Sequence, residues 1–380
     1  MLTTTDELRE FAEKARGAPA IGMDTEFMRE KTYFARLCLI QISLDSDTVI
    51  MDPLAIEDLS PLFEILRDRG VVKVLHAGTQ DLEIFYRLMG EAAAPVFDTQ
   101  VAATLAGFPQ QTGYAALVKD LMGVQLDKAD TFTDWARRPL TSAQVEYAHD
   151  DVRYLLPVYE KLRHALERDE RIEWLEKDFA RLADSAFYEV VPEEQWRRVK
   201  RVSSLNRRQL AVAREVAAWR EREAQRRNVP KRWIVSDESV IEISRRMPGS
   251  TADLESIRGV ADKLPRGAYA GMLEAVKRGK TTPESELPVL ERRRRRPATD
   301  IDAAVDMMVA LVRLRAREHG VAMPILASRD ELERLASGDR EAHGLLEGWR
   351  REIVGEELLA LLEGRIALAL KEGRLEVEPR

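Results

Sequence analysis

The chain has 380 residues, of which 45% are hydrophobic and 33% are charged, and its formal net charge is −7. This length and composition predict a globular protein with two or three separately cored domains, and the negative charge argues against a protein that coats nucleic acid nonspecifically. The charged N-terminal segment excludes a signal peptide, and no uncharged apolar stretch approaches the ~18 residues of a membrane span. We therefore expect a cytoplasmic protein without membrane partners.

The first 155 residues mix strand and helix patterns. A capping box at Thr4 and Glu7 predicts a short first helix, and three apolar segments that follow predict adjacent strands at 20–27, 37–44 and 48–51. A fourth apolar segment, 71–76, leads through a loop into a helical pattern over 81–88. This order predicts an α/β fold with a mixed sheet and flanking helices. Beyond Asp98 the pattern is almost wholly helical.

Two helical blocks follow, over about 205–278 and from 300 onward. Between them, residues 281–299 contain three prolines and the arginine run 292–296, a composition typical of a linker. The second block resembles a divergent copy of the first at an offset of 92 residues, with Ser236 matching Ser328, although two bundles can share such spacing by chance. The stretch from Arg197 to Arg232 contains thirteen Lys or Arg residues and three Glu. It is either a phosphate-contacting surface or a solvated helix face.

Two carboxylates stand inside the apolar segment 20–27. Asp24 and Glu26 are two residues apart, so on a strand they share one face. Two acids on a buried strand repel each other and lose solvation, a cost that a bound cation offsets. The alternative is an edge strand with solvated acids.

Further acids occur at two helices. Asp81 is expected at a helix N-terminus, where Asp is also a common cap. Thr141 and Gln144 form a capping box that opens a helix, and this helix carries Tyr147 and Asp151 one turn apart on one face. Asp150 points about 100° away around the same helix and is the poorer candidate.

Together these residues suggest a site for two hard divalent cations. Asp24, Glu26, Asp81 and Asp151 supply oxygen ligands, and two ions about 3.5–4 Å apart clamp the attacking and leaving oxygens of a displacement at phosphorus. With an ordinary pKa of about 10, Tyr147 is better suited to orient the attacking water than to act as a base. The spacing leaves other metal-dependent phosphohydrolases open.

These motifs resemble the tyrosine subtype of the DEDD exonuclease superfamily. Within it, Asp98-Thr99-Gln100, Asp134-Trp135 and Arg138-Pro139-Leu140 are similar to the ribonuclease D family. The resemblance implies a ribonuclease H-like exonuclease domain over 1–190, a first HRDC helical-bundle domain over 200–282, a linker over 283–299 and a second HRDC-like domain over 300–375. It also implies two Mg²⁺ or Mn²⁺ ions on the four acids, with Tyr147 positioning the water.

The implied reaction is removal of nucleoside 5′-monophosphates from RNA 3′ ends, and the implied substrates are tRNA precursors. The paired helical domains would form a substrate platform, and removing either one is expected to spare hydrolysis of short oligomers. A monomer is favoured. The expected substrate contacts are Thr25, Phe27, His76, Lys128 and Arg138, although Phe27 is also suited to the core and the two basic residues to surface salt bridges.

Two other functions stay open. A DNA 3′–5′ exonuclease would use the same metal chemistry, because discrimination against DNA depends on contacts to the 2′-hydroxyl. A non-catalytic RNA-binding scaffold would keep the fold, but loss of an acid or of the tyrosine would be its sign, and all five residues are present. A helicase is disfavoured, because the chain has no phosphate-binding loop motif.

Overall fold

The computed structural model describes residues 1–126, 133–290, 301–340 and 344–380. The chain divides into two compact units. The first comprises Met1–Glu26, Leu37–Tyr188 and Arg296–Arg380, and the second comprises Phe27–Arg36 and Glu189–Arg295. Within the described ranges, no helix is long and apolar enough to cross a membrane.

A five-stranded mixed sheet forms the centre of the first unit, in the order β3-β2-β1-β4-β5. Strand β1 pairs in parallel with β4, and β4 in parallel with β5, whereas β2 and β3 pair antiparallel. The strands are β1 (Ala20–Met28), β2 (Arg36–Leu44), β3 (Asp47–Met51), β4 (Val72–Leu75) and β5 (Val96–Asp98). The mixed sheet is as predicted. The sequence pattern does not predict β5, because a strand of three residues is too short to show an alternation of apolar and polar side chains.

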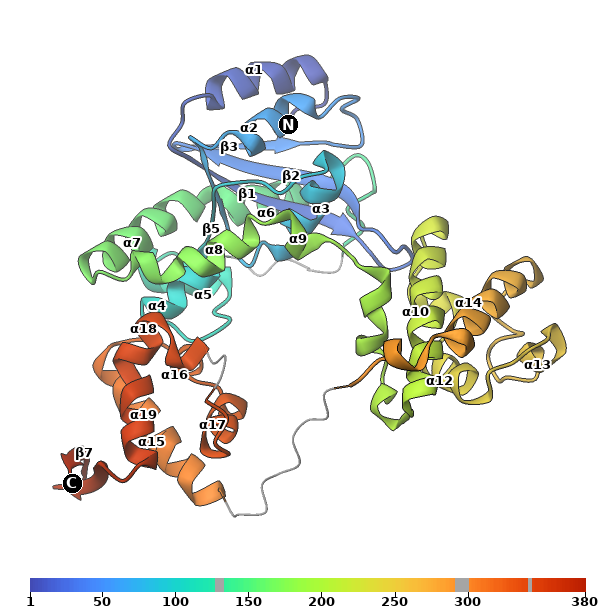
Figure 1. Ribbon diagram of the computed structural model, residues 1–380. Coiled ribbons are helices and arrows are strands. Elements are labelled where there is room, and N and C mark those ends of the chain that lie inside the picture. Colours follow the sequence, from blue (N-terminus) through green and yellow to red (C-terminus); the bar gives the residue numbers. More distant parts are fainter. Residues whose placement is uncertain (127–132, 291–300, 341–343) are drawn as a thin grey trace. The chain divides into compact units, whose positions relative to one another are not determined.

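Helices cover both faces of this sheet (Figure 1). One face packs against α1 (Thr5–Ala15), α2 (Ser60–Arg67) and α3 (Thr79–Met89). The other packs against α4 (Thr99–Leu105), α5 (Tyr114–Met122) and α7 (Leu155–Arg168). The helix α6 (Ser142–Arg153) begins at the predicted capping box of Thr141 and Gln144, and the capping box at Thr4 opens α1.

The second helical block belongs to this first unit and shares a hydrophobic core with the sheet. The rings of Trp174 and Trp349 stack with centroids 4.6 Å apart, and the Ala322 N–H donates to the Thr104 carbonyl at 3.0 Å. The main helices of the block are α15 (Asp302–Glu318), α16 (Met323–Leu326), α17 (Arg329–Ala336) and α19 (Glu356–Leu362). The sequence analysis expects that removal of this block spares hydrolysis of short oligomers. Because the core is shared, we expect instead that its removal damages the exonuclease fold.

The chain then forms a hairpin of β6 (Ile366–Lys371) and β7 (Arg374–Pro379), where the sequence pattern predicts helix. The prediction is wrong here because Ala and Leu in β6 are strong helix formers. The turn residues Glu372 and Gly373 both have positive φ, of 51° and 78°, which suits a tight two-residue hairpin turn.

The second unit is a helical bundle with its own core. Its main helices are α10 (Arg207–Arg227), α11 (Lys231–Ile234), α12 (Asp237–Arg246) and α14 (Tyr269–Thr281). A Cβ on Gly279 would lie 2.4 Å from the Val212 Cα, so only glycine permits the close approach of α14 to α10. The segment Phe27–Arg36 packs with this unit through Tyr33, whose hydroxyl donates to the buried carboxylate of Glu221.

Candidate active site

The two carboxylates of β1 lie in the interior of the sheet. Strand β1 has β2 on one side and β4 on the other, so the alternative of solvated acids on an edge strand is wrong. Ile21 and Met23 pack into the core beneath α1, α2 and α3. Because side chains alternate along a strand, Asp24 and Glu26 face the opposite side, where both are half-buried.

Asp81 lies in the first turn of α3 and is only 7% exposed. The N-cap of this helix is Gly78, so Asp81 is not the cap. The buried hydroxyl of Thr25 donates to Oδ1 of Asp81 and fixes its orientation. Burial raises the pKa of Asp81, although the bond from Thr25 opposes that rise. The sequence predicts Thr25 as a substrate contact, and in the structure its hydroxyl contacts Asp81.

Helix α6 carries Tyr147 and Asp151 on one face, as the spacing predicts. Burial, and then the charge of Asp150, raises the pKa of Asp151 to about 7, and the Tyr147 hydroxyl opposes this rise. Oδ2 of Asp151 is buried without a hydrogen-bond partner among the described residues. Asp150, the poorer candidate on this helix, pairs with Arg153 at 2.5 Å.

The four carboxylates act on one another electrostatically. Burial, followed by the charges of Asp81, Asp151 and Glu26, raises the pKa of Asp24 far above its usual range. Burial, with Asp151 and Asp81, raises the pKa of Glu26 to about 8. In the described ranges, no Lys or Arg forms an ion pair with any of the four. The cluster therefore lacks a compensating positive charge from the described part of the chain.

Two tyrosines border the cluster. Burial, then the charges of Asp151, Glu26 and Asp24, raises the pKa of Tyr147, so its hydroxyl stays protonated at neutral pH. Burial and the charges of Asp151 and Asp24 likewise raise the pKa of Tyr114, whose hydroxyl accepts the backbone N–H of Tyr154 at 3.1 Å. Sequence reasoning misses Tyr114, because a tyrosine at the start of an amphipathic helix carries no distinguishing signal.

The predicted substrate contacts differ in their surroundings. Phe27 is half-buried, next to Glu26 on β1. Both ring nitrogens of His76 already have protein partners: Nε2 donates to the Thr112 carbonyl, and Nδ1 lies 3.0 Å from the Thr99 hydroxyl. Lys128 lies outside the described residues.

Arg138 has a structural role instead of a phosphate contact. Its Nε and Nη2 donate to both carboxylate oxygens of the buried Asp52, at 2.5 and 2.7 Å. Its remaining N–H groups donate to the carbonyls of Trp135, Arg137 and Cys38. All five donors are thus in use, so the prediction of Arg138 as a substrate contact is corrected.

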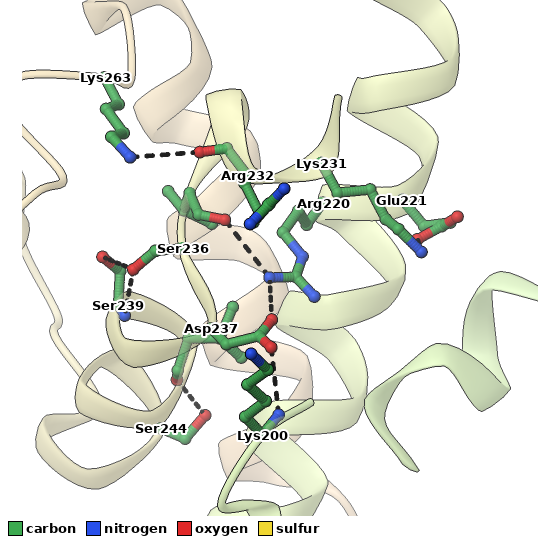
Figure 2. A network of polar contacts seen from close by, with 12 residues as sticks. Lys200, Arg220, Glu221, Lys231, Arg232, Ser236, Asp237, Ser239, Ser244 and Lys263 are labelled. Carbon is green, nitrogen blue, oxygen red and sulfur yellow. Dashed lines mark hydrogen bonds and ion pairs between the residues drawn. The ribbon is translucent and has the colours of Figure 1, made fainter. Parts of the chain in front are cut away.

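The basic stretch from Arg197 to Arg232 is largely neutralised within the second unit. Eight of its thirteen basic residues pair with acids, including Arg220 with Asp237 at 2.8 Å (Figure 2). Lys200 and Arg232 are exposed without an ion pair to any described residue. Trp233 follows Arg232 and is 51% exposed, and Nζ of Lys263 bonds the Arg232 carbonyl at 3.3 Å. An aromatic ring among cations is the pattern of a surface that binds single-stranded nucleic acid.

As the side chains lie, the described residues contain no group of three or more acidic, histidine or cysteine side chains in metal-coordinating geometry. The case for metal ions therefore depends on the chemistry of the donor set. Four carboxylates with raised pKa values, with no paired cation among the described residues, are hard oxygen donors of the kind that Mg²⁺ and Mn²⁺ prefer.

Comparison with known families identifies both units. A 3′–5′ exonuclease family model matches residues 1–167, which contain the carboxylate cluster. An HRDC domain model matches residues 209–276, which contain most of α10 and all of α11 and α12. One HRDC domain is found in this way, in the first helical block.

Curated relatives match along the whole chain. Ribonuclease D of Gluconacetobacter diazotrophicus is 43% identical over 100% of this chain and 96% of its own length. Ribonuclease D of Jannaschia sp. is 42% identical over 99% and 98% of the two chains. The crystal structure of Escherichia coli RNase D, described as an exoribonuclease involved in structured RNA processing, covers 96% of this chain and 98% of its own. It has a TM-score of 0.80 and 36% identity.

Proposed function

Because the chain belongs to the ribonuclease D family and is a 3′–5′ exoribonuclease, we propose that the carboxylate cluster is its catalytic centre and binds two divalent metal ions. The proposed ligands are Asp24, Glu26, Asp81 and Asp151. The observation that carries this proposal is a group of four desolvated carboxylates. Burial raises the pKa values of all four, and the charges of Asp81 and Asp151 raise those of Asp24 and Glu26 further. The unpartnered Oδ2 of Asp151 is suited to the same role.

Bound Mg²⁺ or Mn²⁺ would lower the pKa of water and neutralise charge on the scissile phosphate. The protein side chains do the positioning. Thr25 holds Asp81 by a hydrogen bond, and the Tyr147 hydroxyl acts on the Asp151 carboxylate. Since the pKa of Tyr147 is raised, this hydroxyl serves to orient the attacking water and is not a base. The products would be nucleoside 5′-monophosphates.

We propose structured RNAs with an accessible 3′ end, such as tRNA precursors, as the substrates. The exposed ring of Trp233 would stack on a base, while Lys200, Arg232 and Lys263 would contact phosphates. Lys200, Arg232 and Lys263 lie around a segment that the buried Arg220 holds through the Val235 carbonyl and Asp237 (Figure 2). The binding surface is thus supported by the bonds of the buried Arg220 guanidinium.

We also propose that the second helical block is a diverged HRDC domain. Its elements follow those of the first at an offset of 92 residues: α16 starts at Met323 where α11 starts at Lys231, and α17 starts at Arg329 where α12 starts at Asp237. The serines Ser236 and Ser328 cap α12 and α17 in the same way. Its acids are engaged locally, as in the bidentate pair of Glu357 with Arg315 at 2.6 Å, which favours a packing role over RNA binding.

A 5′-labelled RNA with a stem and a single-stranded 3′ tail tests the catalytic proposal, beside a matched DNA, in Mg²⁺, Mn²⁺ or EDTA. We expect a ladder that shortens from the 3′ end, requires metal and prefers RNA. Asp151→Asn should abolish it, whereas the adjacent Asp150→Asn should retain it, because the Asp150 carboxylate is paired with Arg153 and is not a proposed ligand. Equal losses in both variants would contradict the assignment, and equal attack on DNA would favour the DNA exonuclease.

Trp233→Ala tests the binding surface. It should weaken binding of the tailed RNA and leave hydrolysis of a dinucleotide unchanged, because the ring contributes area for stacking and no chemistry. Trp219→Phe provides a control, since Trp219 packs against the core of the same unit. Loss of dinucleotide hydrolysis in Trp233→Ala would contradict this division of roles.

A further inference from the structure

Gln41 is a glutamine in the middle of an apolar strand. It lies in β2, is 0% exposed, and neither its Oε1 nor its Nε2 has a hydrogen-bond partner among the described residues. Ser43, two residues along the same strand, is 2% exposed, and its Oγ likewise has no partner there. Buried polar groups are nearly always paired, because an unpaired one keeps its full desolvation cost. These two side chains therefore need a functional explanation.

The alternation of side chains places Gln41 on the catalytic face of the sheet. Ile40 and Ile42 of β2 pack into the same core as Ile21 and Met23 of β1, on the face beneath α1, α2 and α3. The side chain of Gln41 points to the opposite face. That face is the one to which β1 presents Asp24 and Glu26, and α6 presents Asp151.

The register between the two strands brings Gln41 opposite Asp24. A Cβ on Gly22 would lie 2.3 Å from Ser43 Oγ, so Gly22 and Ser43 are cross-strand neighbours. The connection between β1 and β2 has seven residues, 29–35, too few for the crossover that parallel neighbours need, so the strands run antiparallel. Two residues further along each strand, Asp24 faces Gln41, with Cβ atoms about 5 Å apart.

We propose that Gln41 is a positioning residue for the Asp24 carboxylate. In the metal-loaded enzyme, Nε2 of Gln41 donates to the Asp24 oxygen that faces away from the metal, and Oε1 accepts from the Ser43 hydroxyl. This assignment rests on the proposed metal site. It gives each of the three buried groups a partner, and it fixes a ligand in the way that outer partners fix metal ligands generally.

The amide suits this position for an electrostatic reason. A lysine would place a positive charge beside Asp24 and compete with the cations, while a glutamate would add a fifth negative charge to a cluster already under repulsion. An apolar side chain would leave the carboxylate only the backbone hydrogen bond of Thr25. The neutral amide of glutamine, with one donor group and one acceptor group, avoids all three outcomes.

Gln41→Met separates this role from a merely structural one. Methionine has a similar volume and no unpaired polar atoms, so the metal-free variant should melt at the same temperature as wild type or higher. Its affinity for Mg²⁺, measured by isothermal titration calorimetry on the full chain, should fall 10–100-fold. A structural glutamine would change stability and leave Mg²⁺ affinity untouched.

Two further variants complete the experiment. Ser43→Ala removes only the hydroxyl that orients Gln41, so we expect a several-fold loss of Mg²⁺ affinity with little change in melting temperature. Ile42→Val, on the opposite face of β2, should lower the melting temperature and keep the affinity. Wild-type affinity in Gln41→Met would overturn the assignment of Gln41 alone. Absence of Mg²⁺ binding by the wild type would overturn the proposed metal site and this inference with it.

Discussion

The crowding of carboxylates predicts that the metal-free protein loses stability as the pH rises. In an unfolded chain, a glutamate ionises near pH 4.5, whereas burial, Asp151 and Asp81 raise the pKa of Glu26 to about 8 in the folded protein. Between these values the folded state binds more protons than the unfolded state. The free energy of unfolding therefore falls with rising pH through this window. Glu26→Gln removes the titrating group and should abolish its part of that fall.

The magnitude follows from the pKa change. A rise from 4.5 to about 8 corresponds to about 5 kcal/mol at 1.36 kcal/mol per pH unit. Because the neighbouring carboxylates share the repulsion and titrate together, we expect a single substitution to recover roughly 2 kcal/mol. For a domain of this size that is roughly 4–8 °C in Tm. The gain of Glu26→Gln should be near zero at pH 5 and complete at pH 8.5.

Thermal unfolding in EDTA across pH 5–8.5, followed by circular dichroism, measures this effect. Glu10→Gln, at an exposed position of α1, serves as the control and should follow wild type at every pH. Adding Mg²⁺ should stabilise wild type more at pH 8.5 than at pH 5, since cations bind the ionised carboxylates. A wild-type Tm that stays flat between pH 5 and 8.5, or an equal gain for Glu26→Gln at both ends, would refute the reasoning.

Three further substitutions test structural roles by thermal unfolding. Arg138→Lys keeps the charge but loses the bidentate bond to Asp52, and should cost about 2 kcal/mol without raising KM for RNA; a raised KM with unchanged Tm would restore the phosphate contact. Trp349→Ala should cost about 2 kcal/mol by removing a stacked ring from the shared core, and an unchanged Tm would show that the second block is independent. Tyr33→Phe should cost roughly 1–3 kcal/mol, because it removes a donor to the buried carboxylate of Glu221; a loss below 0.5 kcal/mol, about the usual surface effect, would contradict that.

Local sequence patterns account for most of the exonuclease fold. The first four strands lie within one residue or so of the predicted apolar segments, and both predicted capping boxes open helices. The candidate catalytic residues also follow from local spacing, because alternation along β1 and the helical turn of α6 fix which side chains share a face. The hairpin of β6 and β7 is not predictable in this way, since its residues favour a helix and only pairing between the two strands forms the sheet.

The roles of several polar residues depend on contacts that no local pattern contains. The sequence predicts Arg138 as a phosphate contact. In the structure, Nε and Nη2 of its guanidinium bond Asp52, which is 86 residues away in the chain. The basic stretch from Arg197 to Arg232 contains many cations in the sequence. In the structure, most of them form ion pairs with acids on other turns and helices. Gln41 shows only as a polar residue in an apolar strand, and its position opposite Asp24 requires the strand register.

The sequence by itself determined the candidate catalytic residues of this protein: four acids and a tyrosine, spaced so that strand and helix geometry turn them to common faces. The tertiary structure decided which charges are compensated and which domains are separate. It joined the second helical block to the sheet in one core, a result that depends on packing between residues about 180 positions apart, such as Trp174 and Trp349. Local periodicity indicates which face of a helix or strand is apolar. Which element packs against that face depends on the fold of the whole chain.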